Sequence, residues 1–258
     1  MRSTKRLPST KASLSIPTNF SAPRARFIPP TKSVNALARK TVLGFTQLVV
    51  VLGILLLVPA WTVDYWQAWV YLSVFIASSA LITAYLWKKD RKLLERRVNA
   101  GPGAESEKSQ KRIQVLASLV FMGEIILPSL DHRFSWSAVP LPITITGDVL
   151  VALGFLIVFL VFKANTFTAA TIAVTADQKV VSTGPYAVVR HPMYSGALVM
   201  LFGTPLALGS WWGLSMFIPM ILTIAWRARD EERFLRENLR GYEDYCQAVR
   251  YRLVPFVW

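Results

Sequence analysis

The sequence predicts an all-α integral membrane protein with about six transmembrane segments. Hydrophobic residues make up 53% of the 258 residues and charged residues only 17%, whereas roughly a quarter of the residues in a soluble domain are charged. The apolar residues come in long uncharged runs, where a soluble chain would interrupt its hydrophobic pattern every few residues. The lysines and arginines gather in the stretches between these runs. These three observations define the fold class.

Four apolar runs of sufficient length precede residue 163. They cover residues 43–60, 66–87, 113–130 and 141–162. Each can cross a hydrocarbon core of about 30 Å at a rise of about 1.5 Å per residue. The third run carries Glu124 and the fourth carries Asp148. Because an ionisable group at bilayer depth is costly, we expect both carboxyls to face other helices or a wet cavity.

A fifth apolar stretch, 193–226, contains no charged residue. As one helix its 34 residues would be about 51 Å long, which exceeds a single span. Gly203-Thr204-Pro205 and Gly209-Ser210 interrupt it. The stretch therefore predicts two short helices packed as a hairpin that turns near 209–212.

The distribution of positive charge predicts the orientation. The tail 1–40, the loops 88–112 and 163–192, and the chain from 227 onward hold 28 of the 29 lysines and arginines. Six segments put all four stretches on one side of the membrane, and cytosolic loops carry such an excess of positive charge. We expect both termini in the cytosol, with a cytosolic C-terminal helix after the hairpin. The membrane would be a bacterial inner membrane, or the endoplasmic reticulum in a eukaryote.

Composition excludes several other classes of protein. The net charge of +14 does not indicate nucleic-acid binding, because the basic residues flank apolar runs and do not cover one soluble face. A lone cysteine, Cys246, excludes an internal disulfide, and two histidines make a histidine-built metal site improbable. We therefore expect no metal.

The first 40 residues contain no Asp or Glu and are rich in Ser, Pro and basic residues. We interpret 1–40 as a basic disordered tail near anionic lipid headgroups. An organelle transit peptide is an alternative, whereas a secretory signal would need an apolar region close behind the first basic residues. The chain divides into this tail, a membrane bundle at 41–162 with the loop 88–112, where the LLERR sequence suggests a short surface helix, and a third region at 163–258.

Two patterned stretches mark the chemistry, and the hairpin between them brings them side by side. The first is 178–196, in which Gly184-Pro185 makes a tight turn that lets a ligand approach the backbone. The second is 227–245, in which Arg227 and Glu231 are four residues apart and share one helix face. Arg227 alone could be a membrane-edge arginine that pairs with Glu231. The combination of both stretches is more specific than either.

These stretches resemble the isoprenylcysteine carboxyl methyltransferase family and, more distantly, phosphatidylethanolamine and other lipid methyltransferases. The similarity is carried by GPYAVVRHPMYSG, the hairpin, RARDEE, GYEDY and the terminal RLVPFVW, within 163–258. It implies S-adenosylmethionine as the cofactor. The implied cofactor contacts are Gln178, Lys179, Val180, Val181, Tyr186, His191, Pro192, Met193, Tyr194 and Glu231. Eukaryotic members often carry His where this chain has Gln178.

The resemblance also implies roles near the acceptor. Arg227 matches an arginine held near the substrate carboxylate, and a carboxylate is already a nucleophile that needs no general base. An amine or thiol acceptor would need a proton acceptor, for which Glu232 or His191 could serve. The sequence leaves the acceptor open.

We therefore expect a membrane-embedded, S-adenosylmethionine-dependent methyltransferase acting on a lipid-like or isoprenylcysteine-type carboxylate at the cytosolic face. Its partners would be the lipid bilayer and a lipidic or small-molecule methyl acceptor. Two alternatives remain: an NADPH-dependent enzyme of the sterol-reductase type, and a non-catalytic membrane scaffold or transporter.

Overall fold

A computed structural model describes residues 34–98, 103, 105, 107–168, 170 and 178–258. These residues form helices, turns and loops, with no strand among them. The α-helices are α1 (Val34–Ala60), α2 (Trp66–Lys89), α3 (Arg91–Val98), α4 (Lys108–Phe134), α5 (Leu141–Ala164), α6 (Pro192–Ala207), α7 (Phe217–Asn238) and α8 (Tyr242–Ala248). Two short 3₁₀ helices, η1 (Gly184–Ala187) and η2 (Trp212–Met216), complete the described elements. The all-α prediction is confirmed.

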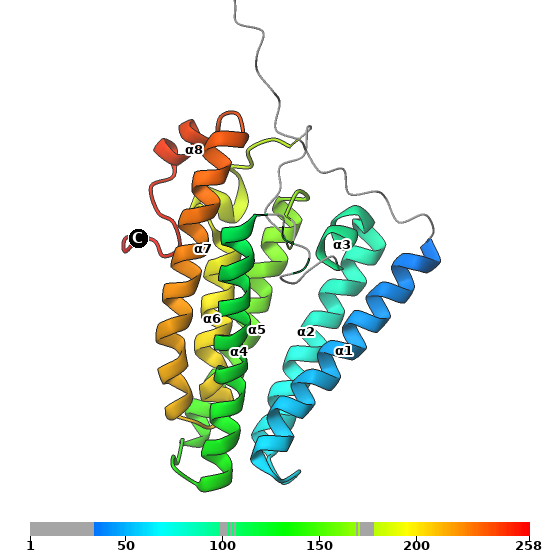
Figure 1. Ribbon diagram of the computed structural model, residues 1–258, viewed down its shortest axis with the longest axis vertical. Coiled ribbons are helices and arrows are strands. Elements are labelled where there is room, and N and C mark those ends of the chain that lie inside the picture. Colours follow the sequence, from blue (N-terminus) through cyan, green and yellow to red (C-terminus); the bar gives the residue numbers. More distant parts are fainter. Residues whose placement is uncertain (1–33, 99–102, 104, 106, 169, 171–177) are drawn as a thin grey trace, which may run out of the picture.

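The long helices stand side by side as a bundle (Figure 1). Four of them, α1, α2, α4 and α5, are long and apolar enough to cross a membrane. They contain the four runs expected from the sequence, and α3 is the short helix expected after the second run. The protein is therefore a multi-pass membrane protein. The shorter α6 and α7 run antiparallel beside these spans, so the count of six crossings stays a prediction.

The tail prediction needs a correction at its end. Helix α1 begins at Val34, so the last seven residues of the expected 1–40 tail are helical. Their sequence, VNALARK, contains Ala, Leu, Arg and Lys, which favour helix, and the last proline before them is Pro30. The remainder of the predicted tail, 1–33, lies outside the described residues.

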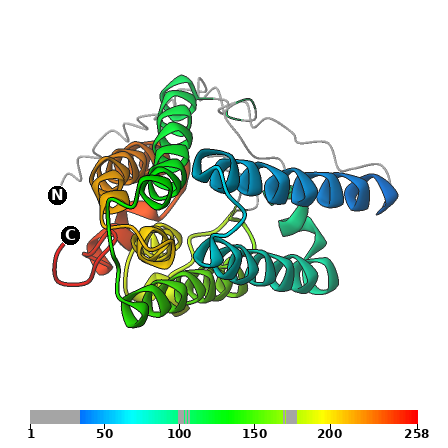
Figure 2. The ribbon, with the colours of Figure 1, turned by 90° about the horizontal axis from the view of Figure 1, so that it is seen from below.

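The tightest helix pair is α5 with α6. A Cβ added at Gly154 would lie 2.6 Å from the carbonyl oxygen of Gly196, and one added at Gly203 would lie 2.7 Å from that of Gly147. Small residues of this kind let helix backbones approach closely in a membrane. Helix α6, which begins at the predicted site, is thus held against a long spanning helix. The pair lies together in the view along the bundle (Figure 2).

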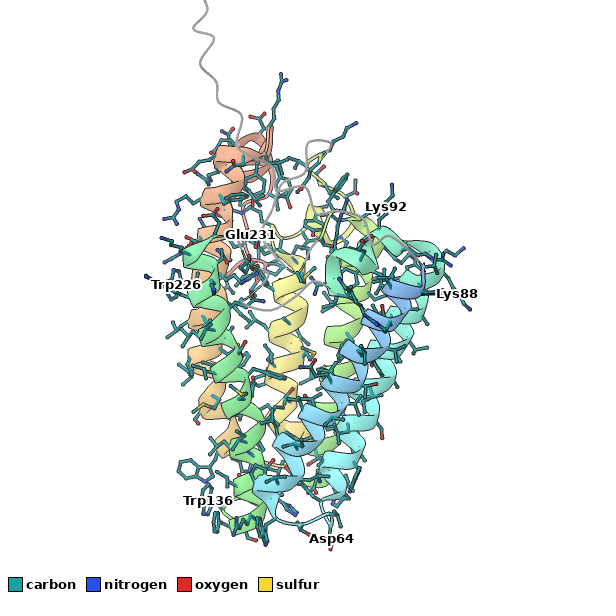
Figure 3. The ribbon with its side chains drawn as sticks, turned by 45° about the vertical axis from the view of Figure 1, so that its right-hand side comes forward. Asp64, Lys88, Lys92, Trp136, Trp226 and Glu231 are labelled. Atoms are coloured by element: carbon teal, nitrogen blue, oxygen red, sulfur yellow. The ribbon has the colours of Figure 1, made fainter. Side chains whose placement is uncertain are left out.

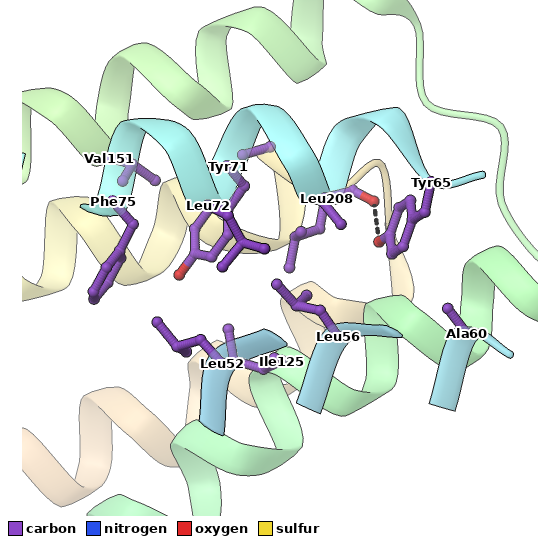
Figure 4. Close-up of a cluster of buried hydrophobic side chains, with 12 residues drawn as sticks. Leu52, Leu56, Ala60, Tyr65, Tyr71, Leu72, Phe75, Ile125, Val151 and Leu208 are labelled. Carbon is purple, nitrogen blue, oxygen red and sulfur yellow. Dashed lines mark hydrogen bonds between the residues drawn. The ribbon is translucent and has the colours of Figure 1, made fainter. Parts of the chain in front are cut away.

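The apolar core lies where α1, α2, α4 and α5 meet the turn after α6 (Figure 4). Its members include Leu52, Leu56, Tyr65, Tyr71, Leu72, Phe75, Ile125, Val151 and Leu208. The hydroxyl of Tyr65 donates to the carbonyl oxygen of Leu208 at 2.7 Å, which satisfies a polar atom that would otherwise be costly to bury. This bond ties the hairpin turn to the second span.

The two carboxyls within the spans are buried, as expected. Glu124 has no solvent exposure and Asp148 is 8% exposed. Neither oxygen of Glu124 has a hydrogen-bond partner among the described residues. Both side chains face other helices.

The two ends of the bundle differ in character (Figure 3). Lys88 and Lys92 lie at one end, which we call the basic end, and Asp64 and Trp136 lie at the other, which we call the opposite end. Glu231 lies toward the basic end. One residue predicted from the sequence as functional therefore lies toward the end that carries Lys88 and Lys92.

Candidate active site

The two patterned stretches meet at the basic end, joined by hydrogen bonds between distant parts of the chain. The hydroxyl of Tyr245 in α8 donates to the carbonyl oxygen of Tyr186 in η1 at 2.8 Å. The backbone N–H groups of Arg190 and His191 donate to the carbonyl oxygens of Tyr251 and Arg252, each at 2.9 Å. The C-terminal segment thus fastens the start of α6 in place.

A pocket of about 350 Å³ lies between these elements. It is lined by all of the predicted cofactor contacts, namely Gln178, Lys179, Val180, Val181, Tyr186, His191, Pro192, Met193, Tyr194 and Glu231. Arg227 lines it too. One cavity therefore gathers predicted residues that are up to 53 positions apart in the sequence.

Other lining residues were not predicted. Arg97 comes from α3, and Gln114 and Ala117 come from α4. The segment after α5 adds Asn165, Phe167, Thr168 and Ala170, and the C-terminal part adds Leu235, Leu239, Tyr242 and Tyr245. Arg97 lies in a run of basic residues and Gln114 on a largely apolar helix, so neither carries a signal that marks it as a pocket residue.

Helix α6 begins at Pro192, the position expected for a proline at the helix start. Just before it, the His191 ring stacks on the Tyr194 ring with centroids 5.5 Å apart. Nε2 of His191 lies 3.2 Å from Oε1 of Glu232, and Nδ1 lies 3.8 Å from Oε2 of Glu231. His191 therefore stands between the two adjacent carboxylates.

Arg227 and Glu231 are linked through a tyrosine. The Arg227 Nε–H donates to the hydroxyl of Tyr194 at 3.0 Å, and this hydroxyl donates to Oε2 of Glu231 at 2.5 Å. Tyr194 from α6 lies between the two side chains, so a bridge takes the place of the direct pair that residues four apart can form. The bridge orients all three side chains that line the pocket.

Glu232 does not line the pocket, in contrast to its expected catalytic role. Its carboxylate contacts Nε of Arg190 at 3.3 Å and accepts from Nε of Arg252 at 3.0 Å, besides its contact with His191. Burial alone would raise its pKa, but the hydrogen bonds from His191 and Arg252 and the charge of Arg190 outweigh burial and lower the pKa of Glu232 to about 2. Such a carboxylate is a weak base, and its contacts instead fasten α7 to the start of α6.

A carboxylate that the sequence analysis did not single out contacts Arg227. The Nη2–H of Arg227 donates to Oε1 of Glu105 at 2.9 Å. Glu105 lies between α3 and α4, far from either motif in the sequence. Its side chain has no solvent exposure and that of Arg227 is 14% exposed. This is a buried ion pair, and nothing in the local sequence marks it.

Two comparisons with known proteins found similarity, and the first of them covers residues that line the pocket. Residues 142–241 match the family model described as phospholipid methyltransferase. The match runs from the start of α5 through the hairpin to the end of α7, and so covers most of the pocket-lining segments.

A segment of 91 residues is 32% identical to the Delta(14)-sterol reductase TM7SF2 of Mus musculus. This segment makes up 34% of the present chain and 22% of the mouse protein, so the similarity covers only about a fifth of that relative. Over residues 142–241, the chain is therefore similar to the membrane methyltransferases of the phospholipid methyltransferase family.

Proposed function

We propose that the protein is an S-adenosylmethionine-dependent methyltransferase of the isoprenylcysteine carboxyl methyltransferase type, acting on a lipid-like carboxylate. The observation that carries this proposal is the single pocket that gathers the patterned residues of 178–194 with Arg227 and Glu231. The match to the phospholipid methyltransferase family over the same region supports the reaction class.

The pocket residues fit the proposed cofactor. Glu231 offers a carboxylate to an ammonium group, and Lys179 offers a cation to a carboxylate. The hydroxyl of Tyr242 and the side-chain carbonyl of Gln114 are buried without a hydrogen-bond partner among the described residues, and both residues line the pocket. Buried polar atoms are normally paired, so these two are available to a polar ligand. S-adenosylmethionine would supply an electrophilic methyl group on a sulfonium.

A carboxylate acceptor agrees with the protonation chemistry available. An amine or thiol acceptor would need a base at the pocket, and Glu232 is held in ion pairs outside it. Both ring nitrogens of His191 face glutamate carboxylates. A carboxylate needs only alignment and a donor to hold it, and Arg227 offers that donor. The apolar tail of the acceptor would remain in the membrane and enter between helices.

The proposed location of the reaction is the cytosolic face. The pocket lies at the basic end, and positively charged loops favour the cytosol. A reporter fused after Trp258 should then read cytosolic, and one inserted after Trp136 should read outside. A C-terminus found outside would contradict this orientation.

A second candidate is an NADPH-dependent reductase, which the similarity to the mouse sterol reductase favours. The two candidates differ in the cofactor. We expect labelled S-adenosylmethionine to bind the purified protein in detergent saturably, and an excess of NADPH to leave that binding unchanged. His191→Ala should weaken the binding at least about tenfold because it removes the ring that stacks on Tyr194 and contacts both glutamates.

The matched control is His132→Ala, which changes the other histidine of the chain. His132 lies in the last turn of α4 at the opposite end and stacks on Tyr65. It should leave cofactor binding unchanged. Binding of NADPH without binding of S-adenosylmethionine would replace the methyltransferase proposal by the reductase.

A further inference from the structure

Arg227 has little donor capacity left for a ligand. Its Nε donates to Tyr194 at 3.0 Å, and its Nη2 donates to Glu105 at 2.9 Å and approaches the carbonyl oxygen of Ala170 at 3.5 Å. Among the described residues, nothing accepts from Nη1. Because Arg227 lines the pocket, Nη1 is the nitrogen that remains for an acceptor.

This geometry differs from the fork expected of an arginine that binds a carboxylate. A side-on fork uses Nε and one Nη together to hold both oxygens. Here both of those nitrogens are taken by protein groups. An acceptor carboxylate would therefore be held through one oxygen by Nη1, and its second oxygen would stay free.

We propose that Glu105 is a positioning residue with two effects on Arg227. It occupies Nη2, so that Nη1 alone remains to donate to the acceptor, and its negative charge offsets the positive charge of the guanidinium. This inference rests on the proposed function, since it concerns the same acceptor. The carboxylate of Glu105 is buried and in direct contact with the guanidinium, and a charge pair out of water interacts much more strongly than one in solvent. Together, Glu105 and Arg227 carry no net charge.

The reason for such an arrangement lies in how charge changes during methyl transfer. One carboxylate oxygen forms a bond to the methyl carbon as the carbon–sulfur bond breaks, and that bond's electron pair leaves on sulfur. No proton moves, and a negative carboxylate and a positive sulfonium become a neutral ester and a neutral thioether. A strong unpaired cation would bind the carboxylate more tightly than the transition state and would slow the step. Glu105 reduces this excess stabilisation and keeps the guanidinium oriented.

The test separates turnover from binding. The probe is N-acetyl-S-farnesylcysteine with labelled S-adenosylmethionine and purified protein in lipid nanodiscs. Glu105→Gln keeps the shape of the side chain but removes its charge, so Glu105 no longer offsets the charge of Arg227. We expect kcat to fall at least about tenfold while KM for the probe stays the same or falls. The dissociation constant for S-adenosylmethionine should stay within about twofold of wild type, which also reports folding.

Two variants complete the experiment. Glu107→Gln makes the same change at an exposed position two residues away and should leave kcat unchanged. Glu105→Asp keeps the charge with a shorter side chain and should restore part of the lost kcat. Where Glu105→Gln does not fold, Glu105→Asp decides alone, by a lower kcat at unchanged KM.

Three results would overturn the inference. They are an unchanged kcat in Glu105→Gln, a rise in KM without a loss of kcat, and an equal loss in Glu107→Gln. A wild-type protein that binds S-adenosylmethionine and does not methylate the probe would instead refute the carboxylate acceptor, and this inference would fall with it.

Discussion

Both ends of the bundle contain buried carboxylates, but the partners of these carboxylates differ between the two ends. At the opposite end, Asp131 accepts from the backbone N–H of Ser137 at 2.7 Å and from the hydroxyls of Ser137 and Ser210. The Ser210 hydroxyl in turn accepts from the N–H of Gly213 at 2.9 Å. Among the described residues of this network, no buried side-chain polar atom lacks a partner. The network joins α4 to the hairpin turn and leaves nothing for a ligand.

At the basic end, ion pairs outside the pocket hold the charged residues in place, while some polar groups of the pocket-lining residues have no hydrogen-bond partner among the described residues. Glu232 and Glu105 hold the arginines and His191 from outside the pocket. Among the described residues, neither the hydroxyl of Tyr242 nor Nη1 of Arg227 has a hydrogen-bond partner. A saturated polar network therefore indicates a structural role, and a pocket lined by oriented but unsatisfied groups indicates a binding role. Four predictions test this contrast.

The largest effect on stability is expected at the opposite end. Asp131→Ala removes the acceptor of three hydrogen bonds, and we expect it to lower the free energy of unfolding by on the order of 3 kcal/mol. Thermal unfolding in detergent measures the loss. Cofactor binding below the unfolding transition should match wild type, because the pocket lies at the other end. A selective loss of binding without a loss of stability would contradict the contrast.

The second effect is a pH dependence carried by Glu232. Its pKa is lowered to about 2, so its ion pairs stabilise the folded state fully above its unfolded pKa of about 4.3. This stabilisation is lost as the pH falls from about 4.3 toward 2, and it amounts to about 3 kcal/mol at most. Glu232→Gln should remove this part of the acid dependence. Unfolding curves of both proteins between pH 5 and 3 check it, and identical slopes would rule it out.

The third effect concerns turnover at the pocket. Arg227→Lys keeps the charge but cannot donate to Tyr194, Glu105 and the acceptor from three separate nitrogens. We expect a loss of about ten- to a hundredfold in kcat/KM for the acceptor, corresponding to about 1.5–3 kcal/mol, with cofactor binding retained. Activity within about twofold of wild type would reduce Arg227 to a membrane-edge arginine that merely pairs with its neighbours.

The smallest effect is expected for Tyr242→Phe. The hydroxyl of Tyr242 is buried and has no hydrogen-bond partner in the described part of the chain, so its removal should leave the melting temperature unchanged or raise it slightly. If the hydroxyl serves the cofactor, binding should weaken by about fivefold, or roughly 1 kcal/mol. Tyr245→Phe offers the contrast, because the Tyr245 hydroxyl holds the carbonyl oxygen of Tyr186. That change should lower the melting temperature. Equal effects of the two changes on stability would contradict the distinction.

The spans could be predicted because apolar runs of about 18 residues or more, with at most one charged residue each, have few alternatives to crossing a membrane. One wall of the pocket could be predicted because the hairpin forces 178–196 and 227–245 together. The rest depends on packing that no local pattern reveals. Arg97 of α3 and Gln114 of α4 line the pocket, and Glu105, between these helices, pairs with Arg227. The sequence around these three residues does not indicate these contacts.

Glu232 was predicted as a catalytic residue, but it is not among the residues that line the pocket. Adjacent residues on a helix point about 100° apart, and here Glu231 lines the pocket while Glu232 forms ion pairs with Arg190 and Arg252 outside it. The sequence identifies the acidic pair but not which member faces inward. Tertiary packing decides which member faces the pocket, because Arg252 of the C-terminal segment and Arg190, just before α6, form ion pairs with Glu232.

The most direct test of the account is methyl transfer itself. Wild-type protein in lipid nanodiscs is incubated with labelled S-adenosylmethionine and N-acetyl-S-farnesylcysteine, beside Glu231→Gln, which removes the charge that Tyr194 contacts in the pocket. The account predicts a labelled, base-labile methyl ester with wild type and a loss of at least about tenfold with the variant. Absence of methyl transfer by a wild-type protein that binds NADPH would contradict it.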